Sequence, residues 1–170
     1  VSGDLPSMGA DFYQELFSLA PDLPKTLFKH VDVKAQGLRT MQTVDTAVRL
    51  LDKPSELVPA LVALGERHAG YGTEAAHYPV VGQALLTVLK RRVGAGFDAP
   101  AEKAWKATYE TIQATMLGAA DSPRGRELAA AFKKRQAAPE SPADTVRRTW
   151  ATVSGDLPSM GADFYQELFS

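Results

Sequence analysis

The chain has 170 residues, of which 45% are hydrophobic, and its 19 basic and 20 acidic residues leave a net charge of −1. This length can bury one sizeable core, so we expect one domain or slightly more. The nearly balanced charge does not suggest the basic face that nucleic-acid binding needs. The absence of cysteine excludes disulfides and thiolate chemistry. No apolar window is long enough to span a bilayer and no secretory signal is present, so we expect a cytoplasmic protein without a membrane partner.

Helical periodicity runs through the sequence and is broken only at corners that contain proline or glycine, which predicts an all-α fold. The first predicted helix carries Phe12 and Leu16 on one face and ends before Pro21, because proline cannot continue a helix. Further helices are predicted over residues 35–51, 56–69, 79–93 and 101–119.

The helix over residues 56–69 carries a histidine on a leucine stripe. Leu57, Leu61, Leu64 and His68 follow one another at spacings of 4, 3 and 4 residues, so they share one face. A buried imidazole left without a partner costs about 1–3 kcal/mol. On the spacing alone, a core histidine bonded to a backbone carbonyl is favoured over an axial metal bond in an apolar cavity. His30 and His77 show no partner in the sequence, and we interpret both as surface residues.

Residues 121–140 differ in character, because prolines bracket a basic, alanine-rich stretch; they are predicted to be a linker, with a helical spacer as one form. After this linker the chain has the chemistry of a helix start, and Val146, Trp150 and Val153 continue as an apolar stripe.

The sequence contains an internal repeat. Residues 1–18 and residues 153–170 both read VSGDLPSMGADFYQELFS, and the two copies start 152 residues apart, the size of a small domain plus a linker. Divergence would have scattered substitutions through one copy, so the identity indicates tandem units, a permuted chain or a deliberately defined repeat. The start at Val1 rather than at a methionine is interpreted as a slice of a longer product or a trimmed chain.

Several segments together resemble the globin family over nearly the whole chain. Leu64-Gly65-Glu66-Arg67-His68, followed by residues 78–86, is similar to the proximal helix of globins and the helix after it. Ala104-Trp105 with Tyr109 is similar to the start of the last globin helix, and Trp150 precedes Phe169 by 19 residues, as the first-helix tryptophan of globins precedes the end of their second helix. No single segment is specific, but their order and spacing together are.

The resemblance implies a three-over-three globin fold with permuted helix order. Helices B to H would occupy residues 1–120, the linker residues 121–140, and helix A with a second helix B of the next repeat residues 141–170. One globin has a single place for helix B, yet the chain would carry two such helices, with Tyr13 duplicated as Tyr165. One copy completes the local fold, and the other is free or fills a neighbour's place. This predicts a tandem array of adjacent copies or a domain-swapped oligomer.

The resemblance also implies haem b as the cofactor, with His68 as the ligand of its iron. Phe28 is expected to pack on the haem, with Leu27 as the competing assignment. The other residues expected around the haem are Arg39 at a propionate, Leu64 and Val81 in the wall, and Tyr78 beside the proximal imidazole. Flavohaemoglobin-type globins add a glutamate that polarises this histidine; residues 117–121 contain none, and Asp121 is the candidate substitute.

Tyr13 and Gln36 match the distal positions of the family, and Thr40 follows on the same face as Gln36. A Tyr/Gln pair resembles bacterial flavohaemoglobin-type and single-domain globins. Phenol and carboxamide groups both donate hydrogen bonds and stay neutral at physiological pH, and such bonds are strong in a dry pocket. We therefore expect dioxygen to be released slowly.

Three functions follow from these expectations. The leading one is reversible binding of dioxygen and other diatomic gases, for transport or storage. The second is nitric oxide dioxygenation, which would draw on an external reductase because the sequence shows no flavin or nicotinamide module. The third is a globin-like structural or regulatory repeat that binds no haem.

Overall fold

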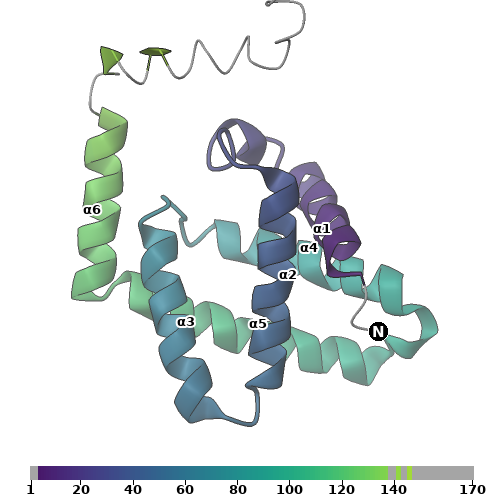
Figure 1. The fold of residues 1–170 in the computed structure, drawn as a ribbon. Coiled ribbons are helices and arrows are strands. Elements are labelled where there is room, and N and C mark those ends of the chain that lie inside the picture. The colour runs from purple at the N-terminus through teal and green to yellow at the C-terminus, as the bar shows by residue number, and fades with distance from the viewer. Residues whose placement is uncertain (1–3, 138–140, 143–144, 147–170) are drawn as a thin grey trace, which may run out of the picture. The chain divides into compact units, whose positions relative to one another are not determined.

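A computed structural model describes residues 4–137, 141–142 and 145–146 of the chain (Figure 1). It divides into two units, residues 1–133 and residues 134–170. Helices α1 to α6 span Leu5–Leu19, Val33–Arg49, Pro54–Ala69, His77–Val93, Ala99–Ala120 and Pro123–Ala137, and the short 3-10 helices η1 and η2 span Leu23–Lys25 and Gly94–Gly96. The described residues form no strand, which confirms the predicted all-α class.

Aspartates fix where three of the helices begin. The Asp4 carboxylate accepts a hydrogen bond from the Ser7 backbone N–H at the start of α1. Asp32 does the same for α2 at 3.0 Å, and Asp98 for α5 at 2.9 Å. Each carboxylate satisfies a backbone donor that has no partner within its helix. Helices α2 and α5 each begin two residues earlier than the apolar periodicity predicts, directly after these caps. Helices α3 and α4 also begin two residues early, but without a side-chain cap.

Two clusters of buried residues form the core. Helix α1 packs on α2 and α4, and α3 packs on α5. The cluster around α1 contains Phe12, Tyr13, Leu16, Leu23, Met41, Ala84, Leu85, Leu89 and Phe97. The cluster between α3 and α5 contains Leu61, Tyr78 and Met116. Helix α3, which carries His68, thus packs against α5.

Glycines let two pairs of helices, α1–α2 and α3–α5, approach closely. A Cβ atom on Gly9 of α1 would overlap the backbone of Gly37 in α2, and one on Gly65 of α3 would overlap the backbone of Met116 in α5. Backbone cannot rotate away as a side chain can, so any larger residue must push the helices apart. Tyr13 and His68 lie on helices whose positions these crossings fix.

We expect Gly65→Ala to lower the free energy of unfolding by about 1–3 kcal/mol, the usual cost of overpacking. Gly118→Ala in α5 is the matched control, since nothing lies within 4 Å of the added Cβ atom. In a helix interior this exchange stabilises by roughly 0.5–1 kcal/mol. Denaturant unfolding of the two variants measures the contrast. Equal stabilities would show that the α3–α5 crossing is not tight.

Helix α6 occupies most of the predicted linker and makes contacts within the first unit. The Leu128 side chain lies against Gly70, and the Phe132 ring lies against Gly72, whose φ of +79° favours glycine. The Ser122 hydroxyl, just before α6, donates to Glu66 of α3 at 2.8 Å. This helix therefore braces the end of α3 and the loop that follows His68.

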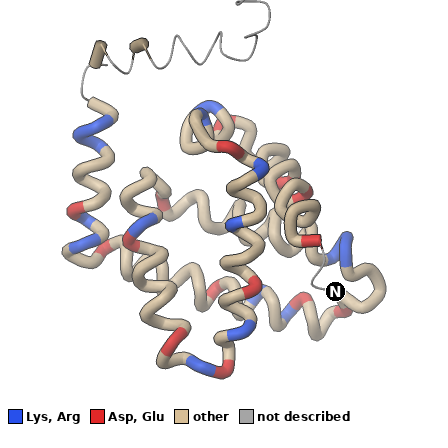
Figure 2. Tube along the Cα trace, in the orientation of Figure 1, with Lys and Arg blue, Asp and Glu red and all other residues tan. Residues whose placement is uncertain are grey.

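Basic and acidic residues are interspersed along most of the described trace (Figure 2). No helix in the described part of the chain is long and apolar enough to cross a membrane.

Candidate functional site

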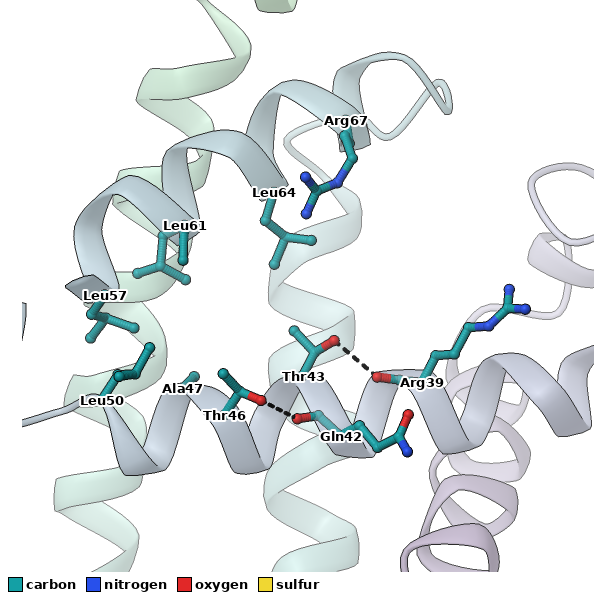
Figure 3. A pocket seen from close by; sticks show the side chains of 11 residues that line it. Arg39, Gln42, Thr43, Thr46, Ala47, Leu50, Leu57, Leu61, Leu64 and Arg67 are labelled. Atoms are coloured by element: carbon teal, nitrogen blue, oxygen red, sulfur yellow. Dashed lines mark hydrogen bonds between the residues drawn. The ribbon is translucent and has the colours of Figure 1, made fainter.

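A cavity of about 380 Å³ lies between α2 and α3 (Figure 3). It is lined by Arg39, Gln42, Thr43, Thr46, Ala47, Leu50, Leu57, Ala60, Leu61, Leu64 and Arg67. The leucines of α3 point towards α2, as the helical stripe predicts (Figure 3). The hydroxyls of Thr43 and Thr46 each donate to the carbonyl four residues earlier at 2.9 Å, so their hydrogens are not free to be donated to a ligand. The cavity therefore presents a mainly apolar wall.

Two arginines border this wall, one from each helix. Arg39 was predicted from the sequence, but Arg67 was not. Within the described part of the chain, neither guanidinium has an ion-pair partner. Arginine forms strong, often bidentate hydrogen bonds with carboxylates. The cavity is thus suited to an apolar ligand that carries acidic groups at its edge.

His68 is oriented by the backbone of its own helix. Its Nδ1 atom lies 2.8 Å from the Leu64 carbonyl oxygen, which can only accept, so Nδ1 carries the hydrogen and donates. Nε2 is then the unprotonated nitrogen, and it forms no hydrogen bond with any described residue. Burial and the nearby charge of Arg67 lower the pKa of His68, against the opposing effect of the Leu64 carbonyl. The neutral imidazole offers a lone pair of the kind that metal binding requires.

Two tyrosines flank this imidazole. The ring centroid of Tyr71 lies 5.8 Å from that of His68, and the ring centroid of Tyr78 lies 6.5 Å away. Tyr78 is buried, and its carbonyl accepts a 2.6 Å hydrogen bond from the Tyr109 hydroxyl. Burial raises the pKa of both Tyr78 and Tyr109, so both phenols are neutral. The structure thus places Tyr78 beside His68, where it was expected, and adds Tyr71, which sequence reasoning missed.

Asp121, the candidate substitute for a polarising glutamate, is not brought to His68. It caps the end of α5 and is exposed. Among the described residues, the charge that affects the pKa of His68 is that of Arg67. His68 is therefore polarised by the Leu64 carbonyl rather than by a carboxylate.

Tyr13, Gln36 and Thr40 come together across the α1–α2 crossing. The Thr40 hydroxyl donates to the Gln36 carbonyl at 2.9 Å, so the 3.2 Å contact between Tyr13 and Thr40 uses the hydrogen of the phenol. Burial raises the pKa of Tyr13, and hydrogen bonds with the side chains of Thr40 and Gln36 oppose this rise. The phenol stays neutral, and it shares its surroundings with the neutral Gln36 carboxamide.

Aromatic rings fix the orientation of Tyr13. Phe28 meets it edge to face with ring centroids 5.2 Å apart, and Phe17 lies 5.5 Å from both Tyr13 and Phe28. Leu27 and Val81 pack against the same cluster. Tyr165, the duplicate of Tyr13, lies outside the described residues.

Of the two histidines interpreted as surface residues, His30 is exposed, as predicted. His77 also takes part in an exposed contact, but it has a partner that the sequence did not signal. His77 is half-buried, and its Nδ1 accepts a 2.9 Å hydrogen bond from the backbone N–H of Glu74. This contact closes the turn before α4, a local role that helical periodicity does not reveal.

We expect the apo chain to lose stability as the pH falls below about 6.5. Folding lowers the pKa of His68 from the ordinary value of 6.5, so above this pH the group is neutral in both states and its contribution is complete. At lower pH the unfolded chain takes up a proton that the folded chain resists. Denaturant unfolding between pH 5.5 and 7.5 measures the slope, which His68→Ala should reduce. Equal slopes in the two chains would contradict this prediction.

Known proteins are similar to this chain over much of its described part. The globin family model matches residues 10–116. The chain is 29% identical over 114 residues to a flavohaemoprotein of Chromobacterium violaceum, a match that covers 66% of this chain and 28% of the relative. It is 34% identical over 103 residues to a flavohaemoprotein of Bacillus cereus, covering 59% and 25%, and 35% identical over 78 residues to neuroglobin-1 of Oncorhynchus mykiss, covering 46% and 49%. The matches thus span between about a quarter and half of the length of these relatives.

Proposed function

The chain belongs to the globin family, and we propose that it binds haem b through Nε2 of His68 and holds dioxygen reversibly. The observation that carries this proposal is the 2.8 Å hydrogen bond from Nδ1 to the Leu64 carbonyl, since it leaves Nε2 as the unprotonated nitrogen. The haem iron, when bound, supplies the chemistry that binds dioxygen or another diatomic gas. The leucine wall suits the apolar macrocycle, and Arg39 and Arg67 suit its two propionates.

The distal residues of the proposed site are Tyr13 and Gln36, with Thr40 as support. A neutral phenol and a neutral carboxamide both donate hydrogen bonds, and dioxygen becomes a better acceptor as it gains negative charge. Without a ligand the phenol donates its hydrogen to Thr40, and on binding dioxygen the hydroxyl would turn to donate it to the ligand, while the surrounding rings restrict the motion of the phenol ring. We therefore propose tight binding with slow release. Phe28, Leu64, Val81 and Tyr78 complete the proposed surroundings of the haem.

A second candidate function is nitric oxide dioxygenation. It is favoured by the juxtaposition of Tyr13 and Gln36 and by the flavohaemoproteins among the relatives. Nitric oxide and dioxygen would combine with one electron to give nitrate, so each turnover needs a one-electron reductant from an external reductase. Sustained consumption of nitric oxide with a reductant present, lost in Tyr13→Phe, would select this function over simple storage.

The proposal includes a tandem organisation. Residues 1–120 would supply globin helices B to H, residues 121–140 the connection that contains α6, and residues 141–170 helix A and a second helix B of the following unit. The support for this order is the 18-residue identity between residues 1–18 and residues 153–170. Adjacent copies would then be arranged as linked globin units or as a swapped oligomer.

Titration of the purified chain with haem tests the proposed function. We expect a sharp Soret band at one haem per chain, and a shift of the visible bands when the reduced protein meets dioxygen. A chain that keeps its helices but binds no haem would be a globin-like structural or regulatory repeat, and the proposal would be wrong.

A further inference from the structure

Helix α1 rests on a surface formed by α2 and α4, which we call the α1 seat. Phe12, Tyr13 and Leu16 are 3%, 4% and 2% exposed in this seat, so each is almost completely removed from solvent. Gly9 meets the backbone of Gly37, a fit that admits no side chain. The seat therefore selects a helix with glycine at one turn and three large apolar side chains on the next two.

Charge adds to this selection. Arg91 of α4 binds Glu15 of α1 at 2.6 Å. Arg92 of α4 binds Asp11 at 2.7 Å and Asp4 at 3.2 Å. The two arginines thus meet an acidic side chain at the N-cap of α1 and two more that lie one turn apart within it, which fixes the register of the helix in the seat.

Residues 153–170, which lie outside the described residues, repeat residues 1–18 without a change. Each residue named above for its contact with the seat therefore has an identical counterpart in the repeat. The counterparts of Asp4, Gly9, Asp11, Phe12, Tyr13, Glu15 and Leu16 are Asp156, Gly161, Asp163, Phe164, Tyr165, Glu167 and Leu168. The described residues thus form one such seat, and the sequence contains two segments whose side chains fit it.

We propose that the α1 seat is also a docking surface for residues 153–170 of a second copy of the chain, which places Tyr165 beside Thr40 and Gln36. The seat of each chain is filled by its own α1, so residues 153–170 of a second copy can occupy it only by taking the place of α1. The exchange replaces every seat contact by an identical one, so it changes no contact energy. Only the role of Tyr165 depends on the proposed function; the docking does not.

Concentration decides which segment fills the seat. Residues 20–32 connect α1 directly to α2, and a short connection of this kind gives an effective concentration of about 1 mM. In dilute solution the chain's own α1 therefore occupies the seat. The segment of a second copy takes its place when chains are concentrated or when α1 is impaired.

Variants of the full chain at two glycines distinguish the role of α1 from the role of residues 153–170. Gly9→Val prevents α1 from fitting the seat, since any Cβ atom there overlaps the backbone of Gly37. We expect this variant to form assemblies with at least twice the mass of the monomer by light scattering, with helix content and unfolding midpoint close to those of the unmodified chain. Gly161→Val, the matched control, should stay monomeric and equally stable. The double variant has no segment that fits, so its cooperative unfolding should be lost.

The proposal would be overturned if Gly9→Val were as destabilised as the double variant, because no second segment would then be filling the seat. It would also be overturned if Gly9→Val kept its stability as a monomer. These measurements need no haem. Failure of haem binding would therefore leave this test intact, and failure of docking would leave the proposed haem site intact.

Discussion

Replacing His68 with alanine is expected to weaken haem binding by more than about 100-fold, since even the loss of a residue that only supports a metal ligand costs 10–100-fold. The structure indicates that the lost contact is the one made by a single atom, Nε2 of His68. The Leu64 carbonyl fixes the hydrogen on Nδ1 at 2.8 Å, and the low pKa that burial imposes keeps Nε2 unprotonated. Competition for haem with a reference haem protein measures the change in affinity.

His30→Ala is the matched control for this substitution, because His30 is an exposed histidine, whereas His68 is half-buried. We expect it to bind haem as the unmodified chain does. Circular dichroism of the apo proteins should show the same helix content for both variants, which separates loss of a ligand from loss of the fold. Equal haem affinity in His68→Ala and His30→Ala would mean that another group holds the cofactor.

Replacing Tyr13 with phenylalanine is expected to raise the dissociation rate of dioxygen by roughly 10- to 100-fold. A hydrogen bond to an acceptor that carries charge contributes about 1.5–3 kcal/mol, and 1.4 kcal/mol corresponds to a factor of ten. The ring itself stays packed against Phe17 and Phe28, so the substitution removes the hydroxyl and little else. Stopped-flow displacement of dioxygen by carbon monoxide measures the rate.

Tyr165→Phe is the control for Tyr13→Phe, since it makes the same change in the repeated segment. In dilute solution, where α1 fills its own seat, this variant should release dioxygen at the unmodified rate. An unchanged rate in Tyr13→Phe would show that the phenol does not contact the ligand. In that case Gln36 would be the distal donor by itself.

The sequence predicts the helices well because their signals are local. Proline and glycine mark the corners, and the leucine spacing puts His68 on the same face as Leu64, which lines the cavity. Helix starts are less accurate, because they depend on single capping side chains such as Asp32 rather than on periodicity. The carbonyl partner of His68 was anticipated as the alternative to a metal bond. The structure shows that the two are compatible, because they involve different ring nitrogens.

The meeting of Tyr13 with Gln36 and Thr40 was expected only from resemblance to a family. Spacing along one helix cannot reveal it, because it depends on how closely two helices cross at Gly9 and Gly37. Arg67 and Tyr71 were missed for a related reason. Their neighbours belong to other turns or other helices, and an arginine or tyrosine near a helix end usually faces solvent.

The bond between haem iron and the imidazole of His68 is the central claim, and resonance Raman spectroscopy of the ferrous protein tests it directly. We predict an iron–histidine stretching band in the unmodified chain that disappears in His68→Ala and is replaced by an iron–imidazole band when free imidazole is added to that variant. A band that persists unchanged in His68→Ala without imidazole, or a chain that takes up no haem at all, would contradict the account.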